Sequence, residues 1–240
     1  MAERDPRPGP DPLAFPGAVA LLVFGGFLAT VAAAHQLLER HGQELLEVER
    51  KVLATGGGFL PLLVLALLLR RDPRFPWRIA PRRLMHAVAV YALCLVPWFV
   101  FASTLHPWLM ELLGQPAPVQ EQLRYFGEPH PHGATFALML GIVCVFGPVA
   151  EEVLFRGFVH NALERLVGVR LALVLGAALF GLLHGLPFAL PLALLGLLFG
   201  WLRVRYGSLA APALAHALHN SLTVLLTSVN PEWILGPGMK

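Results

Sequence analysis

The sequence is poor in charged residues. Asp, Glu, Lys and Arg make up 14% of its 240 residues, whereas they make up about a quarter of an ordinary soluble domain. Hydrophobic residues make up 56% of the chain, and its mean hydropathy is +0.65. This balance argues against a soluble domain and predicts an all-α polytopic membrane protein, because spanning helices need long apolar runs.

Cysteine is also scarce. Cys94 and Cys144 are the two in the chain, and they lie in different apolar runs. They can build neither a disulfide framework nor a Cys-based zinc site. Two catalytic motifs are missing as well, the Gly-x-Ser-x-Gly of serine hydrolases and the His-Glu-x-x-His of zinc peptidases. The formal charge of +3 comes from basic clusters between apolar runs, a pattern typical of membrane orientation rather than of nucleic-acid binding.

Apolar runs predict about seven transmembrane helices. They cover approximately residues 15–38, 52–69, 84–105, 134–163, 169–186, 188–202 and 209–229. The composition of residues 1–14 predicts a disordered N-terminal tail. The N-terminal transmembrane helices and loops are expected in residues 15–133, an intramembrane core in residues 134–230, and a C-terminal tail in residues 231–240. The run of alanines that ends the first span resembles a signal-peptidase site, but the leader is not net positive, which favours a retained helix.

The positive charges predict an orientation. The connector from Arg70 to Arg83 holds six arginines against one acid, Asp72. Short loops rich in Arg and Lys stay in the cytoplasm. With seven spans, the N-terminus is therefore expected in the cytoplasm and the C-terminus outside. The Ala, Leu, Pro and Arg bias indicates a GC-rich bacterial genome, and thus a bacterial inner membrane.

The stretch Phe146 to Gly157 carries charge within an apolar run. It contains Glu151, Glu152 and Arg156, and each ionisable side chain at the centre of a spanning helix costs roughly 2.5 to 3.5 kcal/mol. Glu152 and Arg156 are spaced i, i+4 with the acid first, which favours an ion pair on one helix face. Glu151 points about 100° away from Glu152 and is free for another task. A structural ion network is the alternative interpretation.

Two later spans add imidazoles and an amide. His184 follows Phe180 by one turn on the fifth span, and His216 shares a face with Asn220 on the seventh, with His219 nearby. Each of these side chains could instead make a hydrogen bond between helices whose only role is to hold the helices together. Together they predict a site, because a carboxylate beside an imidazole can activate water, and imidazole and amide hydrogens can stabilise an oxyanion. Zinc is also possible, with Glu151, His184 and His216 as ligands.

The three blocks in this order resemble the CPBP (Abi) family of intramembrane proteases, which includes the type II CAAX prenyl endopeptidases. The resemblance covers roughly residues 134–229, and it implies a helical membrane protease with a cavity that opens within the bilayer. By resemblance, Glu151 activates water with help from His184, and His216 and Asn220 hold the oxyanion. Glu152, Arg156 and Phe180 support the site.

The resemblance implies a membrane-associated protein or peptide substrate, with lipid attachment left open. No cofactor is expected to be required, since no zincin motif is present, and a divalent metal such as zinc is the alternative. Two other classes stay open: a proton-coupled transporter, in which the same residues relay protons, and a non-catalytic immunity or scaffold protein of the same fold.

Glu151 and His184 can form one site only if they lie at a similar depth in the membrane. In a straight helix from Ala134, Glu151 would lie about 10 Å below the midplane, too far from His184. The fourth element is therefore expected to be long, kinked at Gly147–Pro148, or displaced. Close packing of the fifth and sixth spans is expected at five small residues, Gly176, Gly181, Gly185, Gly196 and Gly200.

Overall fold

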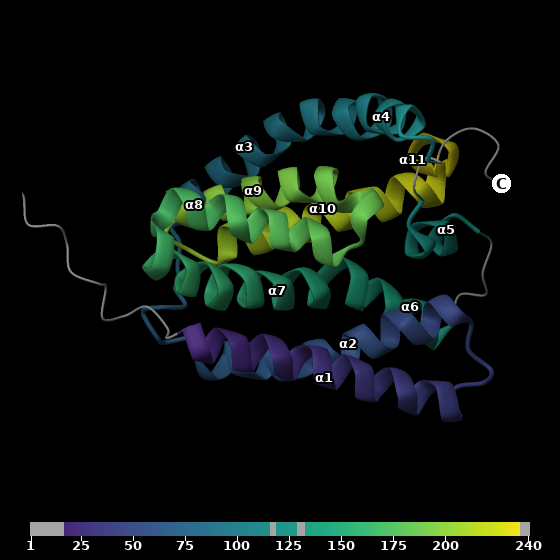
Figure 1. Ribbon diagram of the computed structural model, residues 1–240, viewed down its shortest axis with the longest axis horizontal. Helices are drawn as coiled ribbons and strands as arrows, with labels where there is room; N and C mark the ends of the chain where they lie inside the picture. Colours follow the sequence, from purple (N-terminus) through teal and green to yellow (C-terminus); the bar gives the residue numbers. More distant parts are fainter. Residues whose placement is uncertain (1–16, 116–118, 129–132, 236–240) are drawn as a thin grey trace, which may run out of the picture.

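The protein is helical throughout the residues that its structure describes. The computed structural model describes residues 17–115, 119–128 and 133–235, and all regular secondary structure in these ranges is helical (Figure 1). The all-α prediction is confirmed for this part of the chain. The predicted N-terminal tail lies outside the described residues, as do residues 236–240 of the predicted C-terminal tail.

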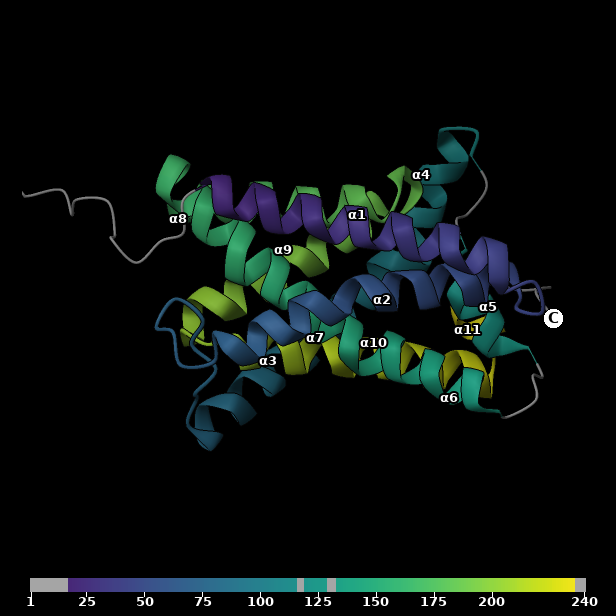
Figure 2. The ribbon, with the colours of Figure 1, turned by 90° about the horizontal axis from the view of Figure 1, so that it is seen from below.

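Helices α1 (Gly17–His41) and α2 (Glu47–Leu68) form an antiparallel pair along one side of the bundle. In Figure 2 this pair faces the viewer and lies over part of α7. The helices come close at Gly58, where a Cβ atom would lie 2.3 Å from Val31. At the start of α2, the Glu49 carboxylate accepts a hydrogen bond from the Leu46 N–H at 2.9 Å, which satisfies a backbone donor that the helix leaves free.

A third helical stretch lies on the opposite side of the bundle. It consists of α3 (Pro81–Val100), a π-helical segment η1 (Phe101–Leu105) and α4 (His106–Leu112). The short helix α5 (Glu121–Gly127) follows and packs against α10 and α2. Ser228 on α10 donates a hydrogen bond to the Phe126 carbonyl at 3.1 Å, which ties α5 to the end of the bundle.

The fourth predicted span is long and continuous. It comprises α6 (Ala134–Gly141), η2 (Ile142–Phe146), α7 (Gly147–Glu152), η3 (Val153–Val159) and the start of α8 (His160–Leu183). The helix continues through Gly147–Pro148, where Gly147 keeps helical dihedrals, with φ −59° and ψ −58°. Pro148 is the second residue of α7, separated from the π-helical turn of η2 by Gly147, and near a helix start a residue that has no N–H to donate is tolerated. The chain breaks instead at Gly168, where φ is +79°.

The remaining helices are η4 (Leu186–Phe188), α9 (Ala189–Tyr206), α10 (Ala210–Val229) and α11 (Glu232–Leu235). Helices α8 and α9 pack closely at three of the five predicted glycines, Gly181, Gly196 and Gly200, where a Cβ would lie within 3.1 Å of the facing helix. Gly176 was wrongly included, since a Cβ there would meet nothing within 4 Å. Gly185 serves the turn between the helices, with φ +98°.

Among the described residues, five helical stretches are long and apolar enough to cross a membrane. They are Gly17–His41, Glu47–Leu68, Pro81–Leu112, Ala134–Leu183 and Leu186–Tyr206. The fourth stretch holds two of the predicted runs, on either side of Gly168. The seventh run is α10, whose hydropathy is lowered by His216, His219 and Asn220. The helices thus support an integral membrane protein, while the count of seven crossings stays a prediction.

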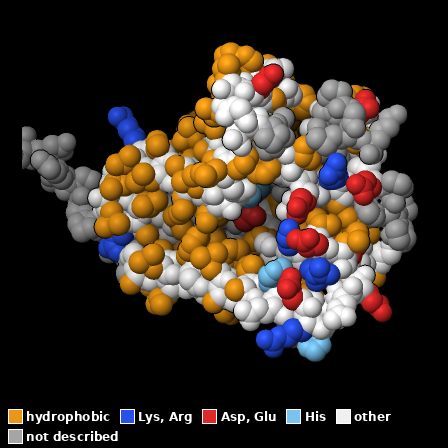
Figure 3. All heavy atoms as spheres, turned by 45° about the vertical axis from the view of Figure 1, so that its right-hand side comes forward, with side chains coloured by type: hydrophobic (Ala, Val, Ile, Leu, Met, Phe, Trp, Pro, Cys, Tyr) orange, Lys and Arg blue, Asp and Glu red, His pale blue; other side chains and the backbone are white. Residues whose placement is uncertain are grey.

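Polar connections gather at the two ends of the bundle, and apolar side chains cover much of the surface between them. Leu22, Leu68 and Leu93 are each about three-quarters exposed, at 74%, 75% and 76%. Figure 3 shows hydrophobic side chains over much of one face, and charged side chains toward its right. At one end, the Leu209 N–H donates a hydrogen bond to the Pro76 carbonyl, so the arginine-rich connector lies beside the turn that follows α9. The assignment of this end to the cytoplasm stays a prediction.

Candidate active site

Glu152 is the centre of a buried polar network. It is the last residue of α7 and has no exposed surface. Its Oε1 atom accepts hydrogen bonds from Arg156 Nη1 and from His216 Nδ1, both at 2.9 Å. The predicted i, i+4 spacing thus corresponds to an ion pair on one helix face, and His216 on α10 joins it from across the bundle. A buried carboxylate needs such partners, because an uncompensated charge would be costly there.

Aromatic rings enclose the cation of this network. The Arg156 guanidinium lies 4.9 Å from the Phe180 ring centre and 5.6 Å from that of Phe199. Its Nη2 atom also donates a hydrogen bond of 2.7 Å to the Gly196 carbonyl on α9. Rings at these distances attract a cation through their negative faces. Arg156 therefore links η3, α8 and α9, which fits the supporting role expected for Arg156 and Phe180.

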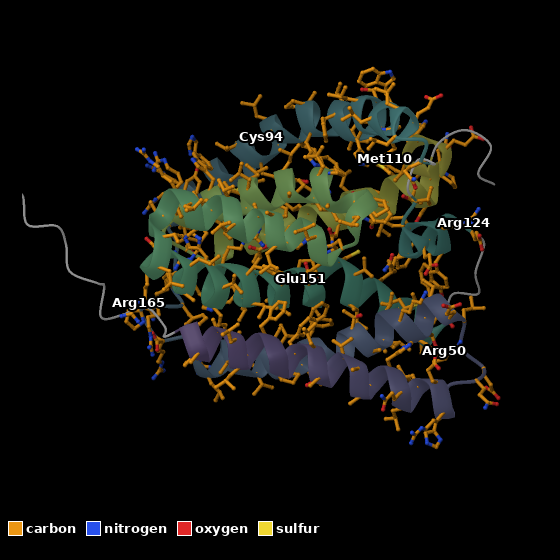
Figure 4. All side chains as sticks on the ribbon, in the orientation of Figure 1. Arg50, Cys94, Met110, Arg124, Glu151 and Arg165 are labelled. Atoms are coloured by element: carbon orange, nitrogen blue, oxygen red, sulfur yellow. The ribbon has the colours of Figure 1, made fainter. Side chains whose placement is uncertain are left out.

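Glu151 faces a different environment from its neighbour. Its side chain is 20% exposed, and its Oε2 atom lies 3.8 Å from Nε2 of His216. Figure 4 places Glu151 midway along the bundle, between Arg165 at one end and Arg50 and Arg124 at the other. A long helix that continues through Gly147–Pro148 thus brings Glu151 to His216, whereas its approach to His184 stays a prediction.

The hydrogen bonds assign the protons of His216. Because the ion-paired Glu152 carboxylate can only accept, Nδ1 of His216 must carry the hydrogen between them. The Nε2 atom then faces Glu151. A hydrogen on Nε2 as well would be directed toward Glu151.

His184 lies where α8 ends. Its own N–H donates to the Gly181 carbonyl, which leaves the Phe180 carbonyl without its usual helical partner. The His184 Nδ1 atom occupies that position at 2.7 Å. A carbonyl only accepts, so Nδ1 carries the hydrogen, and Nε2 of the neutral ring is a free acceptor. The Phe180 ring lies between the two imidazoles, 4.7 Å from the His184 ring and 5.8 Å from the His216 ring.

Asn220 is held by the helix that carries Glu151. Its Nδ2 atom donates a hydrogen bond of 2.9 Å to the Val143 carbonyl in the π-helical segment η2. An amide nitrogen has two hydrogens, so this contact fixes the side chain and leaves a second hydrogen to donate. The widened turn of η2 thus has a second use, because it presents a carbonyl group to α10.

A cavity of about 1030 Å³ connects these groups. Glu151, His184, His216, His219 and Asn220 lie on its wall among many aliphatic and aromatic side chains, and further polar side chains, among them Lys51, Thr55, Glu121 and Thr223, also line it. Figure 3 shows a hollow in this face with acidic and histidine side chains at or near it. A large apolar cavity with a few converging polar groups is the usual form of a ligand site.

The three residues of the alternative zinc site, Glu151, His184 and His216, all line the cavity. Within the described ranges, no three His, Cys, Asp or Glu side chains gather in a way that could hold a metal ion. Nδ1 of His216 is bonded to Glu152, and Nδ1 of His184 to the Phe180 carbonyl. These bonds use the Nδ1 atoms alone, and ligating histidines often make such bonds with the nitrogen that does not bind the metal, so the zinc alternative with Glu151, His184 and His216 stays a prediction.

One group of cavity residues was not predicted as part of the site. His219 on α10 contacts Tyr91 and Trp98, both on α3, a helix to which the sequence assigned no motif. Aromatic residues are common in membrane helices, so Tyr91 and Trp98 did not stand out in the sequence of α3. Their contact with His219 became visible only once α3 was seen to pack against α10.

Taken together, the fold and the cavity define an all-helical membrane protein with a carboxylate and imidazole site between its helices. Comparison with known proteins places the site more narrowly, since residues 133–222 match the family model of type II CAAX prenyl endopeptidase Rce1-like proteins. The resemblance predicted from the three motif blocks is thereby confirmed for this segment. Glu151, His184, His216 and Asn220 all fall within it, whereas α1, α2 and α3 lie outside.

A curated relative matches over a similar length. A Bacillus subtilis (strain 168) protein named "Putative membrane peptidase YdiL" is 28% identical over 90 residues, which cover 37% of this chain and 37% of that protein. The match thus spans little more than a third of the relative's length. No solved structure is significantly similar to this chain.

Proposed function

We propose that the protein is an intramembrane endopeptidase that hydrolyses a peptide bond in a membrane-associated protein or peptide. The observation that carries this proposal is the 3.8 Å approach of the Glu151 carboxylate to the His216 imidazole on the wall of a large, mostly apolar cavity. Hydrolysis needs a base for water and a donor for the developing oxyanion, and these two groups supply both.

Glu151 acts as the general base in this mechanism. It takes a proton from water, and the water oxygen bonds to the carbonyl carbon of the substrate. The Nε2 atom of neutral His184 accepts the second hydrogen of that water and so holds it for attack. The protonated Glu151 then gives its proton to the leaving nitrogen as the C–N bond breaks, which yields a carboxylic acid and an amine and restores the carboxylate.

His216 and Asn220 stabilise the oxyanion. The mechanism requires His216 to carry a hydrogen on Nε2 as well as on Nδ1, so that the Nε2–H points into the cavity, and Asn220 offers the amide hydrogen that Val143 does not use. Glu152 and Arg156 keep the ring of His216 oriented and its charge balanced. Their burial, at 0% and 3% exposure, holds this support in a region of low dielectric, where each charge interaction is stronger.

The substrate is expected to enter from the bilayer. The cavity wall includes Phe24 and Phe27 of α1 and Phe99 of α3, so an apolar segment can lie against it. The relative's name refers to a membrane peptidase, and the matched family model refers to prenyl endopeptidases. The proposed substrate class is an apolar or lipid-modified peptide, and the test compares peptides with and without an attached lipid.

The test uses purified protein in detergent or lipid and a panel of internally quenched apolar peptides, each made with and without a C-terminal prenyl group. We expect the wild type to cleave at least one peptide at a single bond, as read by mass spectrometry. His184→Ala should lower kcat by roughly 100-fold or more, since it removes a group that holds the water. Wild-type rates in this variant would contradict the mechanism, and rates abolished by a chelator would replace it with a metal mechanism.

Cleavage of no peptide by the folded wild type would count against a peptidase. Proton-driven uptake into vesicles would then support the transporter alternative, and its absence would support an immunity or scaffold protein.

A further inference from the structure

His219 holds a position that the proposed chemistry does not use. It lies one turn beyond the start of the His216–Asn220 face on α10, and it lines the same cavity although its residue is 7% exposed. Its Nδ1 atom lies 3.3 Å from the Tyr91 hydroxyl on α3. Its ring meets the edge of Trp98 at 4.6 Å with an interplanar angle of 83°.

Both aromatic partners are themselves fixed. Trp98 donates a hydrogen bond of 2.9 Å from Nε1 to the Pro191 carbonyl at the start of α9. Tyr91 is 4% exposed and packs in a buried cluster with Leu195 and Phe199. The His219 ring is therefore oriented from two directions, by groups on α3 that are held against α9.

The direction of the Tyr91 hydrogen bond follows from burial. Within the described ranges, the Tyr91 hydroxyl has one polar partner, Nδ1 of His219. If Nδ1–H donated to the hydroxyl, the hydroxyl hydrogen would be buried without an acceptor, which is unfavourable. Tyr91 therefore donates to Nδ1. A neutral imidazole whose Nδ1 accepts carries its hydrogen on Nε2.

We infer that His219 is a substrate-binding residue whose Nε2–H donates a hydrogen bond to a backbone carbonyl of a peptide in the cavity. Among the described residues, no hydrogen-bond partner takes this N–H, and the ring lies on the cavity wall. A peptide in an apolar cavity carries carbonyl groups that have lost water, so a fixed donor there contributes both affinity and register. This role rests on the proposed peptidase function and gives α3 a part in substrate recognition.

The kinetic test compares variants on the peptide that the wild type cleaves best. His219→Phe keeps the ring volume and removes the donor, so KM should rise roughly 5- to 20-fold while kcat changes little. His219→Gln places an amide N–H near the Nε2 position, so KM should return to within about threefold of wild type. Tyr91→Phe removes the hydrogen bond that holds His219 in its Nε2–H tautomer, and it should raise KM by a smaller factor than His219→Phe. Thr223→Val is the matched control, because the Thr223 hydroxyl on the same wall already donates to the His219 carbonyl.

A second measurement does not depend on cleavage. Nitrogen-15 NMR of histidine-labelled Glu151→Gln protein in lipid, with His219→Gln for assignment, reports which ring nitrogen of His219 carries hydrogen. We expect an unprotonated Nδ1, and an Nε2–H signal that moves when a panel peptide is added.

The outcomes separate the two proposals. An unchanged KM in His219→Phe, a hydrogen on Nδ1 in the spectrum, or an Nε2–H signal that ignores the peptide would each overturn the role of His219 while leaving the peptidase intact. Absence of cleavage with a peptide-sensitive Nε2–H signal would overturn the peptidase and retain the binding role. If His219→Phe fails to fold, His219→Gln, Tyr91→Phe and the spectrum decide.

Discussion

The two walls of the cavity are fixed in different ways. The wall formed by α7, α8 and α10 carries Glu151, His184 and His216, and behind it lie a buried ion pair and glycine contacts that leave little freedom. The lining that α1 and α2 contribute from one side of the bundle and α3 from the other, called here the apolar wall, is mostly aliphatic and aromatic and faces the outside in part; Phe99, for example, is 37% exposed. The difference separates the task of holding catalytic groups from that of receiving an apolar chain.

The largest effect is expected where the catalytic wall loses its buried cation. Arg156→Met leaves the fully buried Glu152 without its guanidinium, and breaking a buried pair in this way costs about 3 to 5 kcal/mol. Thermal or denaturant unfolding in detergent measures the loss. Arg170→Met, at an exposed position of α8, is the control and should change stability by less than about 0.5 kcal/mol. Equal stabilities for the two variants would mean that the buried pair does not hold this wall.

The next effect tests the close packing of α8 against α9. In Gly181→Ala the added Cβ would lie 2.1 Å from the Ala189 carbonyl oxygen and 2.8 Å from the Ala193 nitrogen, and backbone atoms cannot move aside easily. We expect a loss of about 1 to 3 kcal/mol in unfolding free energy, the usual range for overpacking.

Gly176→Ala is the matched variant on the same helix, where a Cβ meets nothing within 4 Å. Replacing a helical glycine by alanine there should stabilise the protein by about 0.5 to 1 kcal/mol. Opposite signs for the two alanines would support the packing described, and equal signs would contradict it.

These two glycines also show what the sequence could and could not predict. Small residues on adjacent spans predicted close packing of two helices. Gly176 and Gly181 look equivalent in the sequence, but Gly181 lies on the face of α8 that contacts α9 and Gly176 does not. The Glu152–Arg156 pair followed from its spacing of four residues, because the geometry of one helix is known in advance. The bond from Glu152 to His216 joins residues 64 positions apart, and that from Tyr91 to His219 joins residues 128 apart. Both depend on how helices pair, which periodicity does not determine.

The conformation at Gly147–Pro148 was open in the sequence for a related reason. Proline in a helix predicts a kink because it removes one hydrogen bond and crowds the preceding turn. Here the π-helical turn of η2 lies just before Gly147 and the proline, and the same arrangement occurs after α3, where His106 separates η1 from Pro107. The helix is therefore widened beside each of these prolines without being interrupted, and no sequence pattern predicted the π-helical turns.

A smaller effect is expected on the apolar wall. Phe99→Ala removes a partly exposed ring that lines the cavity, so stability should change by about 0.5 kcal/mol or less. The ring contacts substrate equally before and during reaction, so KM should rise severalfold while kcat stays the same. Steady-state kinetics on the best panel peptide measures both. A fall in kcat with unchanged KM would show that this wall also positions the reacting groups.

The smallest effect is expected at the ion pairs near the cavity end. Lys51 lies 2.8 Å from Glu47 and 3.0 Å from Glu121, which joins α2 to α5, but all three side chains are more than 40% exposed. Lys51→Met should reduce stability by about 0.2 to 1 kcal/mol, and added salt should reduce the difference further. Lys51→Arg is the control that keeps the charge. A loss as large as that of Arg156→Met would remove the distinction between buried and exposed pairs.

The adjacent carboxylates Glu151 and Glu152 allow the most direct test, because each substitution removes one charge at nearly the same point in the chain. The measurement is kcat for cleavage of the best panel peptide, together with unfolding of each variant. Glu151→Gln should fold as stably as wild type and lose kcat by at least about 100-fold, since it lacks the base. Glu152→Gln should be clearly destabilised, because Arg156 and His216 lose their acceptor charge. Wild-type kcat in a folded Glu151→Gln protein would contradict the assignment of Glu151 as the residue that activates water.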